Sequence, residues 1–351
     1  MSTAAHPAGD RLLTVVISVY NLEHYIQDCL ESVLQQRYID EIDVIIIDDG
    51  SSDSSGAQIA ATLSRYPEHR VTVVSQANAG ISAARNLGIG LARSPYIAFI
   101  DGDDMWSAAF SEQVIPVLRD GQADLIEFNI GVVTDAGEPV DTVTLVPSGG
   151  AGLRPVDTAA LSEFVDTYEA FVWARVYRRT VWDGIRFPVG RHYEDNATVP
   201  RLYLNARSMY RLEGQLYRYR RRGGSITAVA TLGTVRDLAL NAEEALARSG
   251  EGVHREYWLR LFHKLFLHAC SQNARVDAAS FPEALRVMHR LVRKYQALPA
   301  PDAHTAPHLS LVGFAWHIRV SRGIFLAKRL IKRMLGREIQ ARPRMAMSPP
   351  Q

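Results

Sequence analysis

Short apolar segments alternate with amphipathic ones along residues 12 to 130. The apolar segments are rich in Val and Ile and end at polar residues, which is typical of buried strands. They cover Leu13 to Val19, Asp43 to Ile47, Val71 to Val74, Pro95 to Ile100 and Asp124 to Phe128. Apolar residues at helical spacing predict helices over Leu22 to Gln36, Ser54 to Arg65, Ile81 to Ala92 and Ala108 to Leu118. The alternation predicts an α/β fold with a Rossmann-like, mostly parallel sheet flanked by helices.

The pattern changes after this region. Residues 131 to 165 look irregular and contain turn signals. Residues 166 to 227 mix aromatic side chains with arginines, and from about residue 233 the pattern is helical to the end. We therefore expect a disordered N-terminus over 1–11, a large domain over 12–228, a helical region over 229–340 and a tail over 341–351.

The composition is that of an ordinary globular protein, with 47% hydrophobic and 22% charged residues in 351. The only cysteines, Cys29 and Cys270, lack the spacing of a zinc site or disulfide framework and fit a reducing compartment. The N-terminus has no apolar core of a signal peptide, and no apolar run approaches the ~18 residues that span a bilayer. These features predict a cytoplasmic protein.

Charge is distributed unevenly along the chain. The net charge is +1, but nine Lys/Arg and one Glu between Leu311 and Pro350 give that segment +8, which leaves −7 for the first 310 residues. A body of this charge is not expected to bind nucleic acid, whereas the C-terminal segment favours an anionic surface.

Polar side chains follow four of the predicted strands, at the point where each strand ends. They are Tyr20-Asn21, Asp48-Asp49-Gly50-Ser51, Gln76 to Asn78 and Asp101 to Asp104. Because ligands bind at the carboxyl ends of parallel strands, this coincidence predicts an active site at that edge of the sheet.

Asp101-Gly102-Asp103-Asp104 places three carboxylates within four residues. Such a cluster suits a hard divalent cation, Mg²⁺ or Mn²⁺, that also holds a diphosphate; a solvated turn is the alternative. Asp48-Asp49 suits either ligand binding or the turn into the next helix. Asn78-Ala79-Gly80, with Arg85 one turn into a helix, suits either a phosphate or an ordinary helix start.

Together these segments resemble the family 2 glycosyltransferases of GT-A fold, of the type that builds bacterial polysaccharide, capsule or lipopolysaccharide. The resemblance spans about residues 12 to 228 and departs from the family at Ser18, where proline is common. The motifs that carry it are Ser18 to Asn21, Ile47 to Asp53, Asn78 to Gly80, Ala84 to Asn86, Asp101 to Asp104, Glu194-Asp195, Leu216 to Arg220 and Ser225 to Thr227.

The resemblance implies a nucleotide-sugar half over 12–130 and an acceptor half over 131–228. It implies that Tyr20 and Asp49 (or Asp48) contact the base, that Asp101 lies near the ribose and that Asp103 is the main protein ligand to the metal. The implied donor site consists of Val19, Tyr20, Asn21, Asp48, Asp49, Asn78, Gly80, Arg85, Asp101, Gly102, Arg220 and Ser225.

The resemblance also implies an inverting, single-displacement reaction. Asp195, with Glu194 beside it, would take the proton of an acceptor hydroxyl as that oxygen attacks the sugar of a nucleotide donor, by default a UDP-sugar. Two acidic residues also suit the N-terminus of a helix. His192 is an alternative base, and Trp173, Tyr177 and His192 are candidates for the acceptor side, although aromatic packing explains Trp173 and Tyr177 equally well.

Apolar residues recur at helical spacing from Trp316 to Leu335, opposite a stripe of arginines. This pattern favours a helix on the inner face of the cytoplasmic membrane, where a lipid-linked acceptor would be found; the alternative is a helix packed on the catalytic domain. The helices beyond residue 233 also suit a homo-oligomer.

Two other functions stay open, a sugar nucleotidyltransferase and an inactive carbohydrate-binding scaffold. No Gly-rich loop follows the first strand, which speaks against the nucleotidyltransferase.

Overall fold

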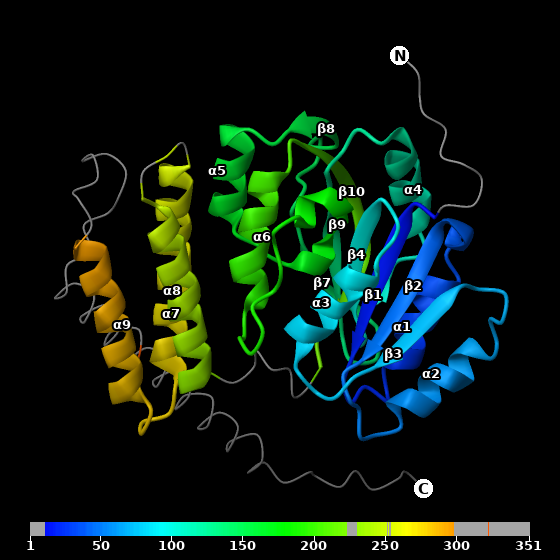
Figure 1. Cartoon of the computed structure of the whole chain (residues 1–351), viewed down its shortest axis with the longest axis horizontal. Helices are drawn as coiled ribbons and strands as arrows, with labels where there is room; N and C mark the ends of the chain where they lie inside the picture. Colours follow the sequence, from blue (N-terminus) through cyan, green and yellow to red (C-terminus); the bar gives the residue numbers. More distant parts are fainter. Residues whose placement is uncertain (1–10, 223–229, 251, 253, 298–321, 323–351) are drawn as a thin grey trace, which may run out of the picture. The chain divides into compact units, whose positions relative to one another are not determined.

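The computed structural model describes residues 11–222, 230–250, 252, 254–297 and 322 (Figure 1). The chain divides into two compact units, residues 1–226 and 227–351.

The first unit is built on four parallel strands, in the order β3-β2-β1-β4. All seven residues of β1 are buried, because helices cover both faces of the sheet and β-branched side chains fill the space between the layers. The strands are β1 (Leu13–Val19), β2 (Ile42–Asp48), β3 (Val71–Ser75) and β4 (Tyr96–Asp101).

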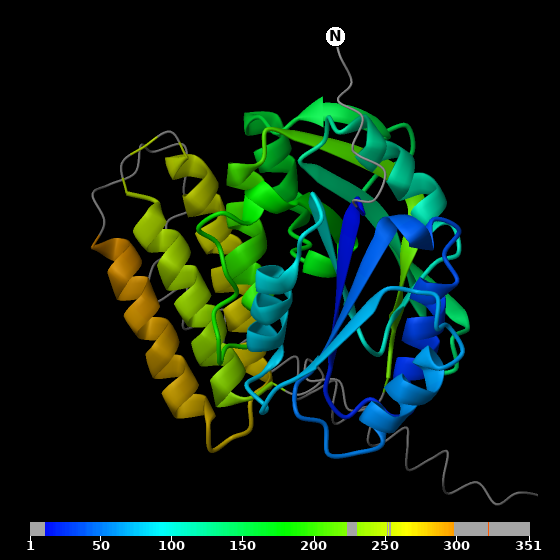
Figure 2. The ribbon, with the colours of Figure 1, turned by 45° about the vertical axis from the view of Figure 1, so that its right-hand side comes forward.

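Helices α1, α2 and α4 cover one face of this sheet and α3 covers the other (Figure 2). Gly88 permits the close approach of α3, since a Cβ atom there would lie 2.3 Å from Val16 Cγ1. The helices are α1 (Ile26–Leu34), α2 (Ser55–Leu63), α3 (Ile81–Leu91) and α4 (Phe110–Asp120), with a short 3₁₀ helix, η1 (Ile39–Glu41), before β2.

The sheet continues beyond β4 in the order β9-β6-β10-β5. Strand β9 is antiparallel to both β4 and β6, β6 and β10 are parallel, and β5 is antiparallel to β10. The bounds are β5 (Met105–Trp106), β6 (Leu125–Val133), β9 (Arg175–Arg178) and β10 (Ser208–Arg220). Two 3₁₀ helices flank β9, and one α-helix follows them; these are η2 (Val172–Ala174), η3 (Arg179–Trp182) and α6 (Glu194–Asn205).

The expectation that residues 131 to 165 are irregular is wrong. They contain β7 (Pro139–Val143), which pairs with β6, β8 (Gly152–Pro155), which pairs with β10, and α5 (Thr158–Thr167). The two strands are mostly exposed, so their sequences carry no apolar run. Their conformation depends on pairing with longer strands, which local sequence does not reveal.

The second unit contains three described helices, α7 (Leu232–Arg248), α8 (Arg255–Arg275) and α9 (Phe281–Gln296). Thr231 begins α7 with a capping box. Leu238, Phe262 and Met288 are completely buried, one from each helix, and form the core of this unit. Among the described residues, no helix combines the length and the apolar character needed to cross a bilayer. The predicted amphipathic helix from Trp316 to Leu335 lies outside the described residues, apart from Arg322.

Candidate active site

The carboxyl ends of β1, β2 and β4 meet at one edge of the sheet. Val19 lies opposite Asp48 in β2, and Ser18 lies opposite Asp101 in β4. The loops that follow these strands therefore leave the sheet side by side, and the polar residues predicted for the site come together there.

Asp49 holds the loop after β3 against the end of β2. Its carboxylate accepts hydrogen bonds from Gln76 Nε2 at 2.6 Å, from the Ala79 N–H at 2.9 Å and from the Gly80 N–H at 2.8 Å. The side chain is 3% exposed. Both carboxylate oxygens are thus engaged by the protein, and Asp49 shapes the loop.

Asp48 is less constrained than its neighbour. Its Oδ1 accepts a hydrogen bond from the Ser51 N–H at 2.9 Å, while the structure shows no partner for Oδ2 within the described residues. Of the two aspartates that the sequence offers for base recognition, Asp48 is therefore the one with an oxygen available to a ligand.

The loop after β1 presents an aromatic ring to solvent. Tyr20 is 49% exposed, whereas the Val19 side chain is buried at 1% and its carbonyl accepts from the Asp49 N–H. Asn21, with a φ of 51°, accepts a hydrogen bond from the Ser52 N–H at 2.8 Å and stabilises the turn. Tyr20 is the member of this group whose side chain can stack on a flat ligand.

Two glycines shape the adjoining loops. Gly50 has a φ of +75°, and a Cβ atom there would lie 2.9 Å from the Asn78 nitrogen. Gly80, with a φ of +87°, is the residue before α3. Asn78 is exposed between them. The close approach at Gly50 makes one continuous surface from the loops after β2 and β3.

Arg85 in α3 joins three carboxylates from two other elements. Its Nη2 donates to Asp101 Oδ1 at 2.7 Å, and its Nη1 donates to Glu194 Oε1 at 2.7 Å and to Asp195 Oδ1 at 3.0 Å. The Arg85 side chain is 2% exposed, and its face lies over the Phe187 ring. The predicted donor half and the predicted catalytic carboxylates thus meet at one buried guanidinium group.

Asp195 lies in the first turn of α6 and is held at both oxygens. Besides the bond to Arg85, its Oδ2 accepts from the Val172 N–H at 3.1 Å. The side chain is 16% exposed. Burial raises the pKa of Asp195 to about 7, against the opposing charge of Arg85 and with a further contribution from Glu194. A carboxylate with this pKa is suited to accept a proton near neutral pH.

Glu194 begins α6 and is 13% exposed. The residue before it, Tyr193, has a left-handed φ of 57° and makes no side-chain cap. The carboxylates of Glu194 and Asp195 point to Arg85 and Val172 and receive these bonds from outside the helix. This arrangement goes beyond what ordinary helix capping requires.

In the loop after β4, the aspartates have different environments. Asp104 is 1% exposed and is engaged by the Tyr217 hydroxyl and the Arg220 N–H, both at 2.7 Å. Asp103 is partly buried, with its side chain 20% exposed, and its Oδ2 accepts from Arg222 Nε at 2.6 Å. Burial, followed by the charge of Asp101, raises the pKa of Asp103.

Glycine is favoured between Asp101 and Asp103, because a Cβ atom at Gly102 would lie 3.0 Å from the Ser18 carbonyl oxygen, which is a tight contact. The described residues contain no group of three or more His, Cys, Asp or Glu that could hold a metal ion. Hard carboxylate oxygens at Asp103 fit Mg²⁺ or Mn²⁺, with the rest of the coordination left to a diphosphate and water.

Arg220 is bound to the protein at every side of its guanidinium group. It donates to the carbonyls of Asp103 and Asp135 and to Asp28 Oδ2 at 2.8 Å. In this arrangement Arg220 supports the main chain of the aspartate loop, and Arg222 contacts the Asp103 carboxylate. Sequence reasoning missed Arg222, although the run Arg218 to Arg222 contains it. Ser225 lies outside the described residues.

The three predicted acceptor residues differ in exposure. Tyr177 is 0% exposed and donates its hydroxyl to the Val172 carbonyl at 3.0 Å, so in this structure its side chain is engaged by the protein and does not reach solvent. Trp173 is stacked between Phe171 and Tyr217, with ring centroids 4.7 and 4.2 Å away, and is 6% exposed. His192 is exposed just before α6.

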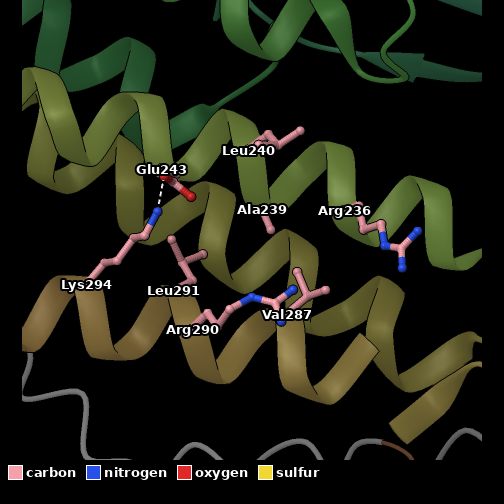
Figure 3. A pocket seen from close by; sticks show the side chains of 8 residues that line it. All are labelled: Arg236, Ala239, Leu240, Glu243, Val287, Arg290, Leu291 and Lys294. Carbon is pink, nitrogen blue, oxygen red and sulfur yellow. Dashed lines mark hydrogen bonds and ion pairs between the residues drawn. The ribbon is translucent and has the colours of Figure 1, made fainter. Parts of the chain in front are cut away.

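The second unit contains a separate pocket of about 280 Å³ between α7 and α9 (Figure 3). Its basic side chains are paired, Arg236 and Arg290 with Glu283 and Lys294 with Glu243. It carries no aspartate cluster, and its lining consists of Arg236, Ala239, Leu240, Glu243, Val287, Arg290, Leu291 and Lys294.

Comparison with known proteins agrees with this geometry. Residues 14–180 match the family Glycosyl transferase family 2. Glycosyltransferase GlyG of Streptococcus pneumoniae serotype 4 is 30% identical over 224 residues, which cover 61% of this chain and 72% of GlyG. The chain belongs to glycosyltransferase family 2. Glycosyltransferase GlyA of the same organism is also 30% identical, over 63% of this chain but only 32% of GlyA.

The GT-A fold predicted for this family 2 chain is confirmed by a solved structure. The crystal structure of S. aureus TarS residues 1–349 in complex with UDP-GlcNAc superposes with a TM-score of 0.66 and 20% identity, over 81% of each chain. At this identity the likeness establishes the fold, and the ligand is a property of TarS.

Proposed function

We propose that this family 2 protein transfers a sugar from a nucleotide-activated donor to a hydroxyl group of a glycan or lipid-linked acceptor, with inversion at the sugar carbon. The observation that carries the proposal is the cluster at Arg85, which brings Asp101 of the donor half within one guanidinium group of Asp195. A base adjoining the donor site is the arrangement that a single displacement requires, because acceptor, sugar and leaving group must lie in line.

Asp195 is the proposed general base. Its raised pKa, its two fixed oxygens and its partial exposure suit a group that removes the acceptor proton as the new bond forms. Glu194 shares Arg85 and adds negative charge that favours a proton on Asp195. Arg85 keeps the three carboxylates together in a site where they would otherwise repel one another.

The proposed donor site lies along the strand ends. Tyr20 would stack on the base, Asp48 would accept a hydrogen bond from it, and the loop from Asn78 to Gly80 would lie along the nucleotide. Asp103 would hold a divalent cation, which when bound supplies positive charge to the departing nucleoside diphosphate. Arg222 occupies one oxygen of Asp103 and would move aside or share it. A UDP-sugar is our first choice of donor because the structural neighbour TarS is seen with UDP-GlcNAc.

The test is a panel of nucleotide sugars with the purified full-length protein and Mn²⁺, scored by release of nucleoside diphosphate with and without glycan acceptors. We expect one donor to be turned over in the presence of a hydroxyl acceptor. Inversion is checked by determining the anomeric configuration of the product. Formation of a nucleotide sugar from a sugar phosphate and a nucleoside triphosphate would instead identify a nucleotidyltransferase.

A further inference from the structure

The two peptide units around Val172 are held from both sides. The Val172 N–H is the group that donates to Asp195 Oδ2. The carbonyl before it, that of Phe171, accepts from Arg175 Nη1 at 2.9 Å, and the Val172 carbonyl accepts from the Tyr177 hydroxyl at 3.0 Å. The donor to Asp195 therefore lies between two carbonyls that are each fixed by a buried side chain.

Both fixing side chains come from β9. Arg175 and Tyr177 are two residues apart in this strand, so they project from the same face of the sheet. Arg175 is 1% exposed and Tyr177 is 0% exposed. Neither side chain touches solvent, which leaves them no role in direct contact with donor or acceptor.

Arg175 is itself fixed by a charged network. Its Nη2 donates to Glu127 Oε1 at 2.7 Å and its Nε donates to the Tyr203 hydroxyl at 2.8 Å. The Tyr203 hydroxyl donates in turn to Glu127 Oε1 at 2.6 Å. Glu127 lies in β6 directly opposite Arg175, and Arg211 of β10 pairs with its other oxygen at 3.1 Å. Every charge in this buried network has a partner, as such networks require.

The network also reaches the helix that carries Asp195. Tyr203 lies in α6, two turns after Asp195 in its first turn. The same set of buried groups thus fixes α6 through Tyr203 and the Val172 peptide through Phe171. The acceptor of this hydrogen bond, Asp195, and its donor, the Val172 N–H, are therefore both held by the same buried network.

We propose that Arg175 and Tyr177 are positioning residues for sugar transfer, which fix the Phe171–Val172 peptide so that its N–H group orients the Asp195 carboxylate. The inference rests on the proposed role of Asp195. Arg85 fixes one carboxylate oxygen and Val172 the other, so together they set the plane of the carboxylate. A general base must lie within hydrogen-bond distance of the proton that it removes. The orientation of the carboxylate plane therefore determines whether an Asp195 oxygen can reach the acceptor hydroxyl.

Tyr177→Phe tests this with the smallest change. It removes the hydroxyl and keeps the ring, which packs against Trp182 at a centroid distance of 5.4 Å. Tyr96→Phe is the matched control. Tyr96 is also buried, at 1% exposure, and its hydroxyl likewise donates to a carbonyl, that of Ala123, at 3.0 Å. Each variant loses one buried hydrogen bond to a main-chain carbonyl, so their losses of stability should be similar.

In Tyr177→Phe we expect kcat at saturating donor to fall ~10-fold, since small misplacements of a reacting group reduce rate steeply. The KM for the donor should stay unchanged, and Tyr96→Phe should match the wild type in both constants. The Val172 N–H lowers the pKa of Asp195, so loosening it should also move the acidic limb of the pH profile upward. The charged groups that act on Asp195 are Arg85, Glu194 and Asp101, and the substitution leaves all three in place. The hydroxyls of Tyr168 and Tyr177 also interact electrostatically with Asp195, but both are neutral across this pH range because burial raises their pKa values.

A second readout does not depend on turnover. Hydrogen–deuterium exchange of the Val172 amide should be faster in Tyr177→Phe than in the wild type and in Tyr96→Phe. Wild-type rates and wild-type exchange in Tyr177→Phe would overturn the proposal and leave the proposed function intact. A wild-type enzyme that turns over no donor would reject the proposed function, and the exchange measurement would still decide whether Tyr177 fixes the peptide.

Discussion

At the scale of single residues, the site depends on how one arginine is shared. Arg85 donates hydrogen bonds to Asp101, Glu194 and Asp195, which lie 16, 109 and 110 residues away in the chain. Because the guanidinium group is planar and always charged, it can hold several carboxylates in fixed directions where a lysine could not. The roles of Glu194 and Asp195 are then separated by their second contacts, since Val172 binds Asp195.

Asp195→Asn keeps the size of the side chain but removes the ability to accept a proton. We expect turnover to fall ~10²–10⁴-fold, the usual contribution of a general base. Nucleoside diphosphate affinity should hardly change, because the residue is proposed to face the acceptor. Steady-state kinetics and calorimetric titration measure the two effects. Glu194→Gln is the matched comparison, and a larger loss of turnover there would assign the base to Glu194.

The pH dependence of the reaction follows from the raised pKa of Asp195. In the proposed reaction the ionised carboxylate is the active form, so kcat/KM should rise with pH and level off above about 7. Below that value we expect a tenfold loss per pH unit, whereas an aspartate with its ordinary pKa near 4 would give a flat profile from pH 5 to 9. Rates measured across that range decide between the two outcomes.

The role of Asp103 is tested by removing the metal or the ligand. Asp103→Ala should abolish transfer and metal-dependent donor binding while leaving the fold unchanged, because the only side-chain contact it removes among the described residues is the one to Arg222, whose side chain is 25% exposed. Circular dichroism checks the fold, and donor titration with and without Mn²⁺ checks binding. Undiminished turnover by the wild type in EDTA would contradict a metal-dependent reaction.

At the scale of elements, the loops after β2 and β3 act as one unit because Gly50 lets them touch. Gly50→Ala would force an alanine into a positive φ and place its Cβ 2.9 Å from the Asn78 nitrogen. We expect a loss of ~1–3 kcal/mol in unfolding free energy and weaker nucleotide binding. Denaturant unfolding and nucleotide titration measure both.

Gly56→Ala is the control for that substitution. Gly56 lies within α2 and has open space around its Cβ position, so alanine there should stabilise the protein by ~0.5–1 kcal/mol. A stabilised Gly50→Ala variant with unchanged nucleotide binding would show that the close contact between the two loops is not needed.

At the scale of the whole chain, the C-terminal segment carries the excess positive charge. We propose that it holds the enzyme on the inner face of the cytoplasmic membrane. The described helix α9 adds four exposed basic residues, Arg286, Arg290, Arg293 and Lys294. Arg286 and Arg290 pair with Glu283, and Lys294 pairs with Glu243, so these pairs offset part of that charge. Each basic side chain near an anionic bilayer contributes ~1 kcal/mol, and salt screens that attraction.

Full-length protein should therefore sediment with vesicles that contain anionic lipid and should be mostly released at high salt. Deletion from residue 311 removes the nine Lys/Arg of the tail and should abolish sedimentation, while transfer to a short soluble acceptor is preserved. Vesicles of neutral lipid serve as the control. Equal sedimentation of the full-length and truncated proteins would show that the tail is not needed for membrane binding.

The sequence by itself determined the parallel half of the sheet and predicted where a site would lie. Strands β1, β2 and β4 are mostly apolar and buried, and β3 at the edge of the sheet is rich in valine but largely exposed. Polar residues follow each of the four strands, so local sequence predicts both the strands and the edge at which a ligand is proposed to bind. Asp48, Asp101, Asp103 and Asp195 are predicted from the sequence because the residue types and order that carry the family resemblance are specific. The roles proposed for them remain predictions.

Tertiary structure alone decided what the remaining residues do. Strands β7 and β8 are mostly exposed and are stabilised by pairing with β6 and β10, so no local sequence pattern predicts them. Sequence could not show that Asp49 is engaged by the loop after β3 or that Tyr177 is buried. It also could not show that Arg222 reaches Asp103, 119 residues away in the chain. Such hydrogen bonds depend on distance in space, which a chain acquires only when its separate elements pack.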